Sequence, residues 1–221
     1  MAGPIERSVT VALPDGRGAV QGDLVLPDGA AGVVLFAHGS GSSRHSPRNR
    51  CVAERLRRRG LGTLLMDLLT TDEDAVDART GEFRFDVELL AGRLASAVAL
   101  LAGDAATRDL PVGLFGASTG GGAALVAAGR EPASVAAVVS RGGRPDLAGD
   151  LLPAVTAPTL LIVGELDPRV IEVNRSAYAR LTVDRALEIV PGATHLFEEP
   201  GTLEQVAQLA GDWFVRHLAG G

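Results

Sequence analysis

Short apolar runs alternate along the chain with stretches in which apolar residues recur at helical spacing. The apolar runs predict strands at residues 8–13, 19–26, 32–37, 62–66, 112–115, 135–140, 159–163 and 186–190. The periodic stretches predict helices at residues 47–59, 83–102, 119–128, 170–181 and 203–218. Strands that alternate with helices in this way predict an α/β protein, with about eight strands in a mostly parallel sheet and helices on both faces.

Three connections between these elements complete this prediction. Pro14-Asp15-Gly16 favours a hairpin-like turn between the first two strands. Residues 67–82 are polar and acidic, and we expect a loop there. Residues 141–153 are expected to form a loop, with room for one short helix. That connection is too short for a lid domain, so we expect an open site without a large cap. We find no repeat and no linker, which predicts a single domain over residues 1–221.

Composition and charge restrict the function classes. Apolar residues make up 46% of the chain and the formal net charge is −6. That charge argues against binding to nucleic acid or to an anionic membrane. No stretch is apolar and long enough to span a bilayer, so a soluble cytoplasmic protein is the expectation. All 21 basic residues are arginine, which excludes Schiff-base and P-loop lysine chemistry. Cys51 is the single cysteine, and we expect a buried structural thiol without a disulfide.

The sequence Gly116-Ala117-Ser118-Thr119-Gly120 lies between a predicted strand and a predicted helix. A serine on such a sharp turn adopts a strained backbone, and glycines two residues away on either side remove side chains that would clash there. The hydroxyl then lies above a helix N-terminus, whose dipole favours developing negative charge. Ser118 is therefore a candidate nucleophile. The alternative is a glycine-rich turn without any chemistry.

A serine hydroxyl needs a base, and the base needs an orienting acid. His195 follows the last predicted strand directly, at the edge of the sheet where sites form, and is our candidate base. Asp167, which precedes a proline after the strand at 159–163, is the candidate acid, and Glu165 is the second choice. Of the other histidines, His45 is expected in a solvated loop and His217 on the surface.

The oxyanion of an acyl-transfer intermediate needs two backbone N–H donors. We expect them from Thr119 and from Ser40, which follows His38-Gly39 in a glycine-rich segment. Three polar residues flank this segment and are candidates either for substrate contacts or for structural hydrogen bonds: Arg44, Arg48 and Asn49. An acidic group without histidines of ligand spacing is expected to be a solvated loop rather than a metal site: Asp72, Glu73, Asp74 and Asp77. No cofactor and no metal are therefore expected.

The order serine, acid, histidine after successive strands resembles the three-layer α/β-hydrolase fold. In this resemblance Ser118 matches the nucleophile elbow, Asp167 and His195 the acid and the base, and His38-Gly39-Ser40 the oxyanion loop. The small size and the lack of a cap are similar to the dienelactone-hydrolase-like branch. Dienelactone hydrolase itself has a cysteine nucleophile, so the serine here favours an esterase mechanism over lactone specificity.

The resulting hypothesis is a serine carboxylesterase that cleaves small carboxylic esters through an acyl-enzyme. Two alternatives remain open at this point. One is a non-catalytic ligand-binding protein of the same fold. The other is an acyltransferase or perhydrolase that uses the same three residues. The physiological substrate and the oligomeric state are not determined by the sequence.

Overall fold

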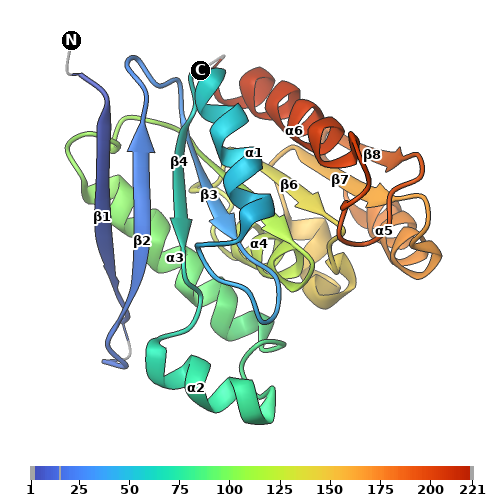
Figure 1. The fold of residues 1–221 in the computed structure, drawn as a ribbon, viewed down its shortest axis with the longest axis horizontal. Coiled ribbons are helices and arrows are strands. Elements are labelled where there is room, and N and C mark those ends of the chain that lie inside the picture. Colours follow the sequence, from blue (N-terminus) through green and yellow to red (C-terminus); the bar gives the residue numbers. More distant parts are fainter. Residues whose placement is uncertain (1–2, 15, 220–221) are drawn as a thin grey trace.

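A computed structural model of the chain describes residues 3–14 and 16–219, which form one eight-stranded sheet flanked by helices (Figure 1). The strand order is β1-β2-β4-β3-β5-β6-β7-β8. β1 and β2 pair antiparallel, β2 pairs antiparallel with β4, and all later neighbours are parallel. The predicted mostly parallel sheet is confirmed. The strands are Ile5–Ala12, Ala19–Leu26, Val33–Ala37, Gly62–Met66, Val112–Ala117, Ala137–Arg141, Thr159–Gly164 and Arg185–Val190.

The helices cover the two faces of the sheet and make three layers. Helix α1 (Pro47–Arg58) and helix α6 (Thr202–Leu218) contact each other and lie on one face, in front of the sheet in Figure 1. The other face packs against α3 (Val87–Gly103), α4 (Thr119–Arg130) and the 3₁₀ segment η1 (Pro145–Ala154). Helix α5 (Pro168–Arg180) contacts η1, β7 and β8.

Each face has its own apolar core, because side chains alternate between the faces along every strand. Leu35, Leu114 and Val138 belong to the cluster with α3 and α4, whereas Phe36, Phe115 and Val139 belong to the cluster with α1 and α6. Trp213 and Phe214 of α6 are buried in the second cluster. Burial on both sides explains why the central strands read as continuous apolar runs.

The expectation of a loop at residues 67–82 is wrong, because helix α2 occupies Thr71–Thr80. Thr70 and Glu73 form a reciprocal capping box, and Gly81 ends the helix with a left-handed backbone at φ 68°. The helix buries almost no apolar side chain, so the hydrophobic pattern could not reveal it. The capping signal could have done so.

The acidic group on α2 is not simply solvated. Glu73 caps the helix and pairs with the buried Arg93. Asp77 is 2% exposed and accepts hydrogen bonds from the backbone of Phe83 and Arg84, and it also pairs with the Arg84 side chain. These contacts hold the segment between α2 and α3. Among the described residues, no group of three or more His, Cys, Asp or Glu side chains is placed to bind a metal ion.

Other differences from the predicted elements are smaller. Helix α3 begins at Val87, because Asp86 caps it, and not at residue 83. The loop at 141–153 contains η1 over much of its length. Cys51 is half-buried rather than buried, and the His217 ring packs on Trp213 instead of lying free on the surface. Asp15, the centre of the predicted turn, lies outside the described residues.

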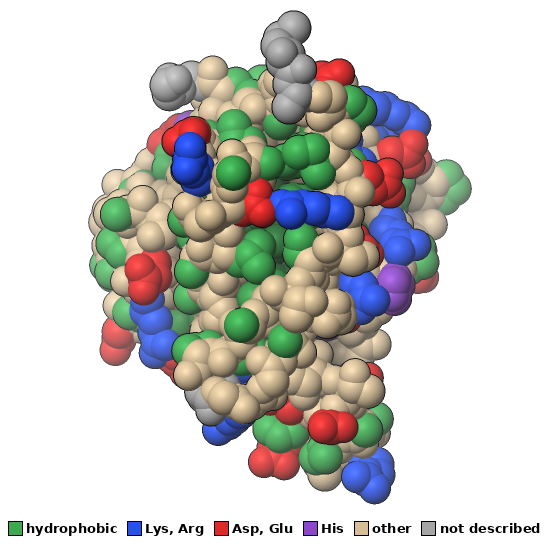
Figure 2. Space-filling model, turned by 90° about the vertical axis from the view of Figure 1, so that its left-hand side faces the viewer, with side chains coloured by type: hydrophobic (Ala, Val, Ile, Leu, Met, Phe, Trp, Pro, Cys, Tyr) green, Lys and Arg blue, Asp and Glu red, His purple; other side chains and the backbone are tan. Residues whose placement is uncertain are grey.

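The surface at the β1 edge carries acidic and basic side chains mixed together, without a continuous basic field (Figure 2). Within the described residues, no helix is both long and apolar enough to cross a membrane.

Candidate active site

Ser118 lies on the sharp turn between β5 and α4. Its backbone has φ 52° and ψ −120°, and it is one of two non-glycine residues with positive φ in the described chain. Such a conformation is costly for a residue with a Cβ and is typical of functional sites. The Ser118 N–H donates to the carbonyl of Arg141 on the neighbouring strand, at 3.1 Å. The predicted strained turn is therefore present.

Glycines let the backbone close tightly around this turn. A Cβ on Gly120 would lie 2.6 Å from the carbonyl oxygen of His38, and one on Gly116 would lie 2.5 Å from the Cα of Gly121. The run of glycines at the start of α4 is thus explained by close packing: Gly120 lies against the end of β3, Gly121 against Ser140 of β6, and Gly122 against the Arg144 carbonyl. This packing sets the height of the Ser118 hydroxyl above the sheet.

His195 and Asp167 meet Ser118 at the carboxyl ends of the parallel strands. The Ser118 Oγ lies 3.3 Å from His195 Nε2, and His195 Nδ1 lies 2.7 Å from Asp167 Oδ2. The Asp167 side chain is 17% exposed and that of His195 is 39% exposed. A hydrogen-bonded chain therefore runs from the hydroxyl through the imidazole to a sheltered carboxylate, and the three predicted residues are brought together.

Glu165, the second choice for the acid, lies elsewhere. Its Oε2 accepts a hydrogen bond from the Gly192 N–H at 2.8 Å. Glu199 accepts from the backbone N–H and the hydroxyl of Thr194, at 3.1 and 2.6 Å. Both carboxylates therefore fasten the loop that carries His195, and neither contacts the imidazole.

The segment after β3 lies directly against the Ser118 turn. A Cβ on Gly39 would lie 3.3 Å from the Ser118 Cβ, a contact so close that any larger residue would push the two segments slightly apart. The hydroxyls of Ser40 and Thr119 are 2.8 Å apart, which joins the two segments predicted to supply the N–H donors. Thr119 begins α4, so its N–H has no carbonyl partner within the helix.

His38 holds this segment in place and is not part of the Ser118 chain. Its Nδ1 donates to the Gly39 carbonyl at 2.9 Å, and its Nε2 accepts from the Leu68 N–H at 3.1 Å. This arrangement requires the neutral imidazole. Burial lowers the pKa of His38 below 6.5, and this effect outweighs the opposing influence of the Asp67 and Asp74 carboxylates.

We predict that stability falls with acid through His38. The unfolded chain takes up a proton near pH 6.5 while the native state does not, so the contribution is complete above that pH and is lost as the pH falls below it. The slope is at most about 1.4 kcal/mol per pH unit. Urea unfolding between about pH 7 and pH 5 should show a shallower decline for His38→Gln than for the wild type. His217→Gln is a second test of the same effect, because burial also lowers the pKa of His217 and this variant should likewise decline less steeply than the wild type. Equal slopes for wild type and His38→Gln would contradict the assignment.

A cavity of about 220 Å³ opens beside Ser118 and His195. Arg48 and Asn49 line it, whereas Arg44 lies in a neighbouring hollow and pairs with Asp67 and Asp23. The structure therefore places two of the three flanking polar residues at the site and one away from it. Leu196, which is 41% exposed, contributes an apolar wall.

Sequence reasoning missed Arg141, which also lines this cavity. Arg141 is the last residue of β6 and pairs in register with Ala117, directly before Ser118. The sequence predicts a loop that begins at this residue, whereas in the structure β6 extends through it. The available signal was an arginine at the carboxyl end of a buried strand beside the nucleophile strand, which is the edge where sites form.

The sheet order, the helices on both faces and the residues gathered at the strand ends define an α/β hydrolase. Comparison with known families agrees, since residues 20–216 match the model of the Dienelactone hydrolase family. The chain belongs to that family. A crystal structure of a dienelactone hydrolase from Anabaena variabilis is 57% identical and has a TM-score of 0.94, covering 98% of this chain and all of the other.

One more distant structure and two relatives with a different name were also found. Est1E from Butyrivibrio proteoclasticus is 15% identical with a TM-score of 0.79, covering 99% of this chain and 100% of the other, which shows the fold alone. Two Mycobacterium tuberculosis proteins, from strains CDC 1551 and H37Rv, are 57% identical over 219 residues and bear the name "putative phosphoribosyl transferase". The match covers 99% of this chain but 48% of theirs, so the chain spans about half the length of these curated relatives.

Proposed function

We propose that the protein is a serine hydrolase that cleaves small carboxylic esters through an acyl-enzyme intermediate. The observation that carries this proposal is the chain of hydrogen bonds from Ser118 through His195 to Asp167, set on a turn with φ 52°. A hydroxyl, a base and an orienting acid in this geometry are the parts that nucleophilic acyl transfer needs.

In the proposed mechanism Ser118 Oγ attacks the acyl carbon, while His195 Nε2 accepts the hydroxyl proton. The same imidazolium then protonates the departing alcohol. Asp167 accepts a hydrogen bond from the Nδ1–H group and stabilises the cation that forms on the ring. Water, activated by His195, then attacks the acyl-enzyme and releases the acid together with free Ser118.

The backbone N–H groups of Thr119 and Ser40 are proposed to stabilise the oxyanion. The N-terminus of α4 adds a favourable dipole at the same point. The site holds a cavity of about 220 Å³ without a separate lid domain over it, which favours small acyl and alcohol groups.

Two measurements test this proposal together. A fluorophosphonate probe should label the folded protein at Ser118, as located by peptide mass spectrometry. A panel of short-chain esters, thioesters, lactones and amides should show turnover of esters first. Labelling without turnover of any substrate would favour another acceptor for the acyl group, and no labelling would favour a binding protein.

Exchanging the acid for its amide should separate the roles of the two carboxylates. Asp167→Asn is expected to lower kcat for ester hydrolysis by about 10³- to 10⁴-fold, because the neutral amide cannot stabilise the imidazolium and its N–H₂ can donate to Nδ1, which favours the unproductive tautomer. Glu165→Gln is the matched control and should retain kcat within about threefold, since the glutamine Oε1 can still accept the hydrogen bond from the Gly192 N–H that Glu165 accepts. Steady-state kinetics of ester hydrolysis by the two variants measures these effects. The reverse order of effects would transfer the role to Glu165.

Acyl transfer to a nucleophile other than water uses the same three residues and stays the alternative. Product analysis with an added alcohol or peroxide separates it from hydrolysis. Phosphoribosyl transfer, the activity in the name of the M. tuberculosis relatives, concerns proteins about twice as long. An assay with a phosphoribosyl donor, run beside the ester panel, tests whether it applies to this chain.

A further inference from the structure

Arg141 carries a buried charge that has no counter-charge. The residue is 7% exposed, and its Nε and Nη1 atoms are buried without a hydrogen-bond partner. Among the ion pairs between described residues, none involves Arg141. Buried charges in proteins are normally paired, so this arrangement points to a group that is not part of the chain.

The surroundings compensate this charge only in part. Burial, with a smaller contribution from the positive charge of Arg48, lowers the pKa of Arg141 to about 10, so the guanidinium stays charged at neutral pH. The Phe197 ring centroid lies 5.7 Å from its Cζ atom, which gives a cation–π contact. That contact stabilises the cation but satisfies none of its N–H donors.

Two other residues that line the same cavity also have buried polar atoms without a hydrogen-bond partner. Arg48 Nε and Asn49 Oδ1 are buried without partners, and Asn49 is 3% exposed. Arg48 has one carboxylate partner, Glu198, which is itself 61% exposed. The residues that line the cavity include two arginines, Arg48 and Arg141, and no carboxylate.

We propose that Arg141, assisted by Arg48, binds an oxyanionic group on the substrate, so that the enzyme selects esters that carry a carboxylate or a phosphate. The inference rests on the proposed function, because it assigns the substrate class of the Ser118 site. The planar guanidinium presents several donors at fixed angles, which match either group. The position of Arg141 beside Ala117 sets the bound anion close to the reacting hydroxyl.

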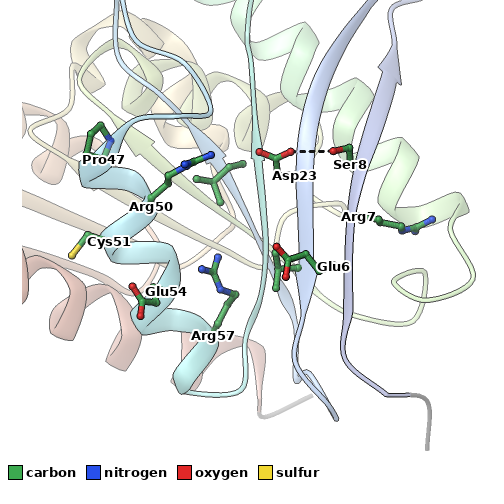
Figure 3. A pocket seen from close by; sticks show the side chains of 11 residues that line it. Glu6, Arg7, Ser8, Asp23, Pro47, Arg50, Cys51, Glu54 and Arg57 are labelled. Carbon is green, nitrogen blue, oxygen red and sulfur yellow. Dashed lines mark hydrogen bonds between the residues drawn. The ribbon is translucent and has the colours of Figure 1, made fainter.

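A second hollow lacks these features. A groove of about 810 Å³ runs between α1 and strands β1, β2 and β4, with Arg50, Arg57 and Cys51 on its helix wall (Figure 3). Acidic and basic residues balance along it, and Ser8 donates to Asp23 within it. Of the described residues that line this groove, none has a buried polar atom without a partner. Unsatisfied charge therefore distinguishes the Ser118 cavity.

The test compares esters that differ only in charge. On the alcohol side, 4-acetoxybenzoate and 4-acetoxyphenyl phosphate are compared with the neutral 4-acetoxybenzamide. On the acyl side, a monoester of succinate is compared with the same ester of succinamate. The wild type should show a kcat/KM about tenfold or more higher for the anionic member of at least one pair. The benzoate and phosphate arms distinguish the two anions.

Arg141→Gln should lower kcat/KM for the preferred anionic ester by about 10- to 100-fold, while the neutral partner changes by less than about threefold. Arg141→Lys should restore part of the preference. Arg144→Gln is the matched control, because this arginine lies three positions further on and pairs with Asp146. Equal losses for charged and neutral esters in Arg141→Gln, or no preference in the wild type, would overturn the proposal.

A binding measurement keeps this inference separate from the proposed reaction. Benzoate and inorganic phosphate are titrated calorimetrically into Ser118→Ala and into Ser118→Ala with Arg141→Gln, and folding of both is checked by circular dichroism. Binding that requires Arg141 supports an anion site even if the wild type hydrolyses no ester. Ester hydrolysis by the wild type, with no anion bound by Ser118→Ala and no charge preference, would retain the proposed function and reject the anion site.

Discussion

Ser118→Ala is expected to lower kcat for short-chain ester hydrolysis by about 10⁵-fold or more, while the protein stays folded. Loss of the nucleophile removes the acyl-enzyme route, and residual rate arises only from binding and from the oxyanion donors. The measurement is hydrolysis of nitrophenyl acetate and butyrate by both proteins, with burst kinetics to detect the acyl-enzyme. Equal rates for wild type and variant would reject Ser118 as the nucleophile.

The strained backbone supplies a control for this variant. At φ 52° and ψ −120°, alanine keeps the strain of serine, whereas glycine relieves it. Ser118→Gly should therefore match or exceed Ser118→Ala in stability, by up to about 2 kcal/mol, although both lack the nucleophile. A variant that is inactive and equally or more stable shows that the loss of rate does not come from unfolding.

Gly120→Ala is expected to destabilise the fold by at least about 3 kcal/mol, or to prevent its accumulation in soluble form. The added Cβ would lie 2.6 Å from the His38 carbonyl oxygen and closer still to that of Ala37, and backbone atoms cannot move aside as a flexible side chain can. Relief requires α4 to shift away from β3, which would also displace Ser118. Denaturant unfolding, together with ester hydrolysis by the folded fraction, measures both effects.

Gly92→Ala is the matched control for that substitution. Gly92 lies on the exposed side of α3 and an added Cβ would meet nothing within 4 Å. Alanine is the better helix former, so this variant should be more stable than wild type by about 1 kcal/mol. A Gly120→Ala variant as stable as Gly92→Ala would show that the turn is not tightly packed.

The proposed anion site at Arg141 would make the proposed hydrolase selective for esters that carry a negative charge. In the proposed mechanism Ser118, His195 and Asp167 would act on the ester bond, and a positive group held close by would decide which esters reach them in a productive orientation. The arrangement places the chemistry and the proposed recognition on adjacent strands, β5 and β6. A substrate held at both points would have little freedom to rotate, which favours attack.

The sequence predicts those elements whose formation depends on neighbouring residues. Continuous apolar runs identify β3 through β7 because both faces of those strands are buried. Ser46 and Pro47 mark the start of α1 because cap chemistry depends on a few neighbouring residues. Helix α2 was missed because its stability comes from its caps and from Arg93 and Arg84, not from an apolar face.

The sequence by itself determined the alternation of strands and helices, the strained Ser118 turn and a short set of candidates around it. These depend on periodicity and on residue chemistry at close spacing. Only the tertiary structure showed that Asp167, and not Glu165, hydrogen-bonds His195, that Arg44 lies away from the cavity, and that Arg141 lines it. Those distinctions depend on which side of a strand end each side chain leaves and on which distant segments pack beside it. Burial without a partner, the property that makes Arg141 informative, belongs to the folded chain alone.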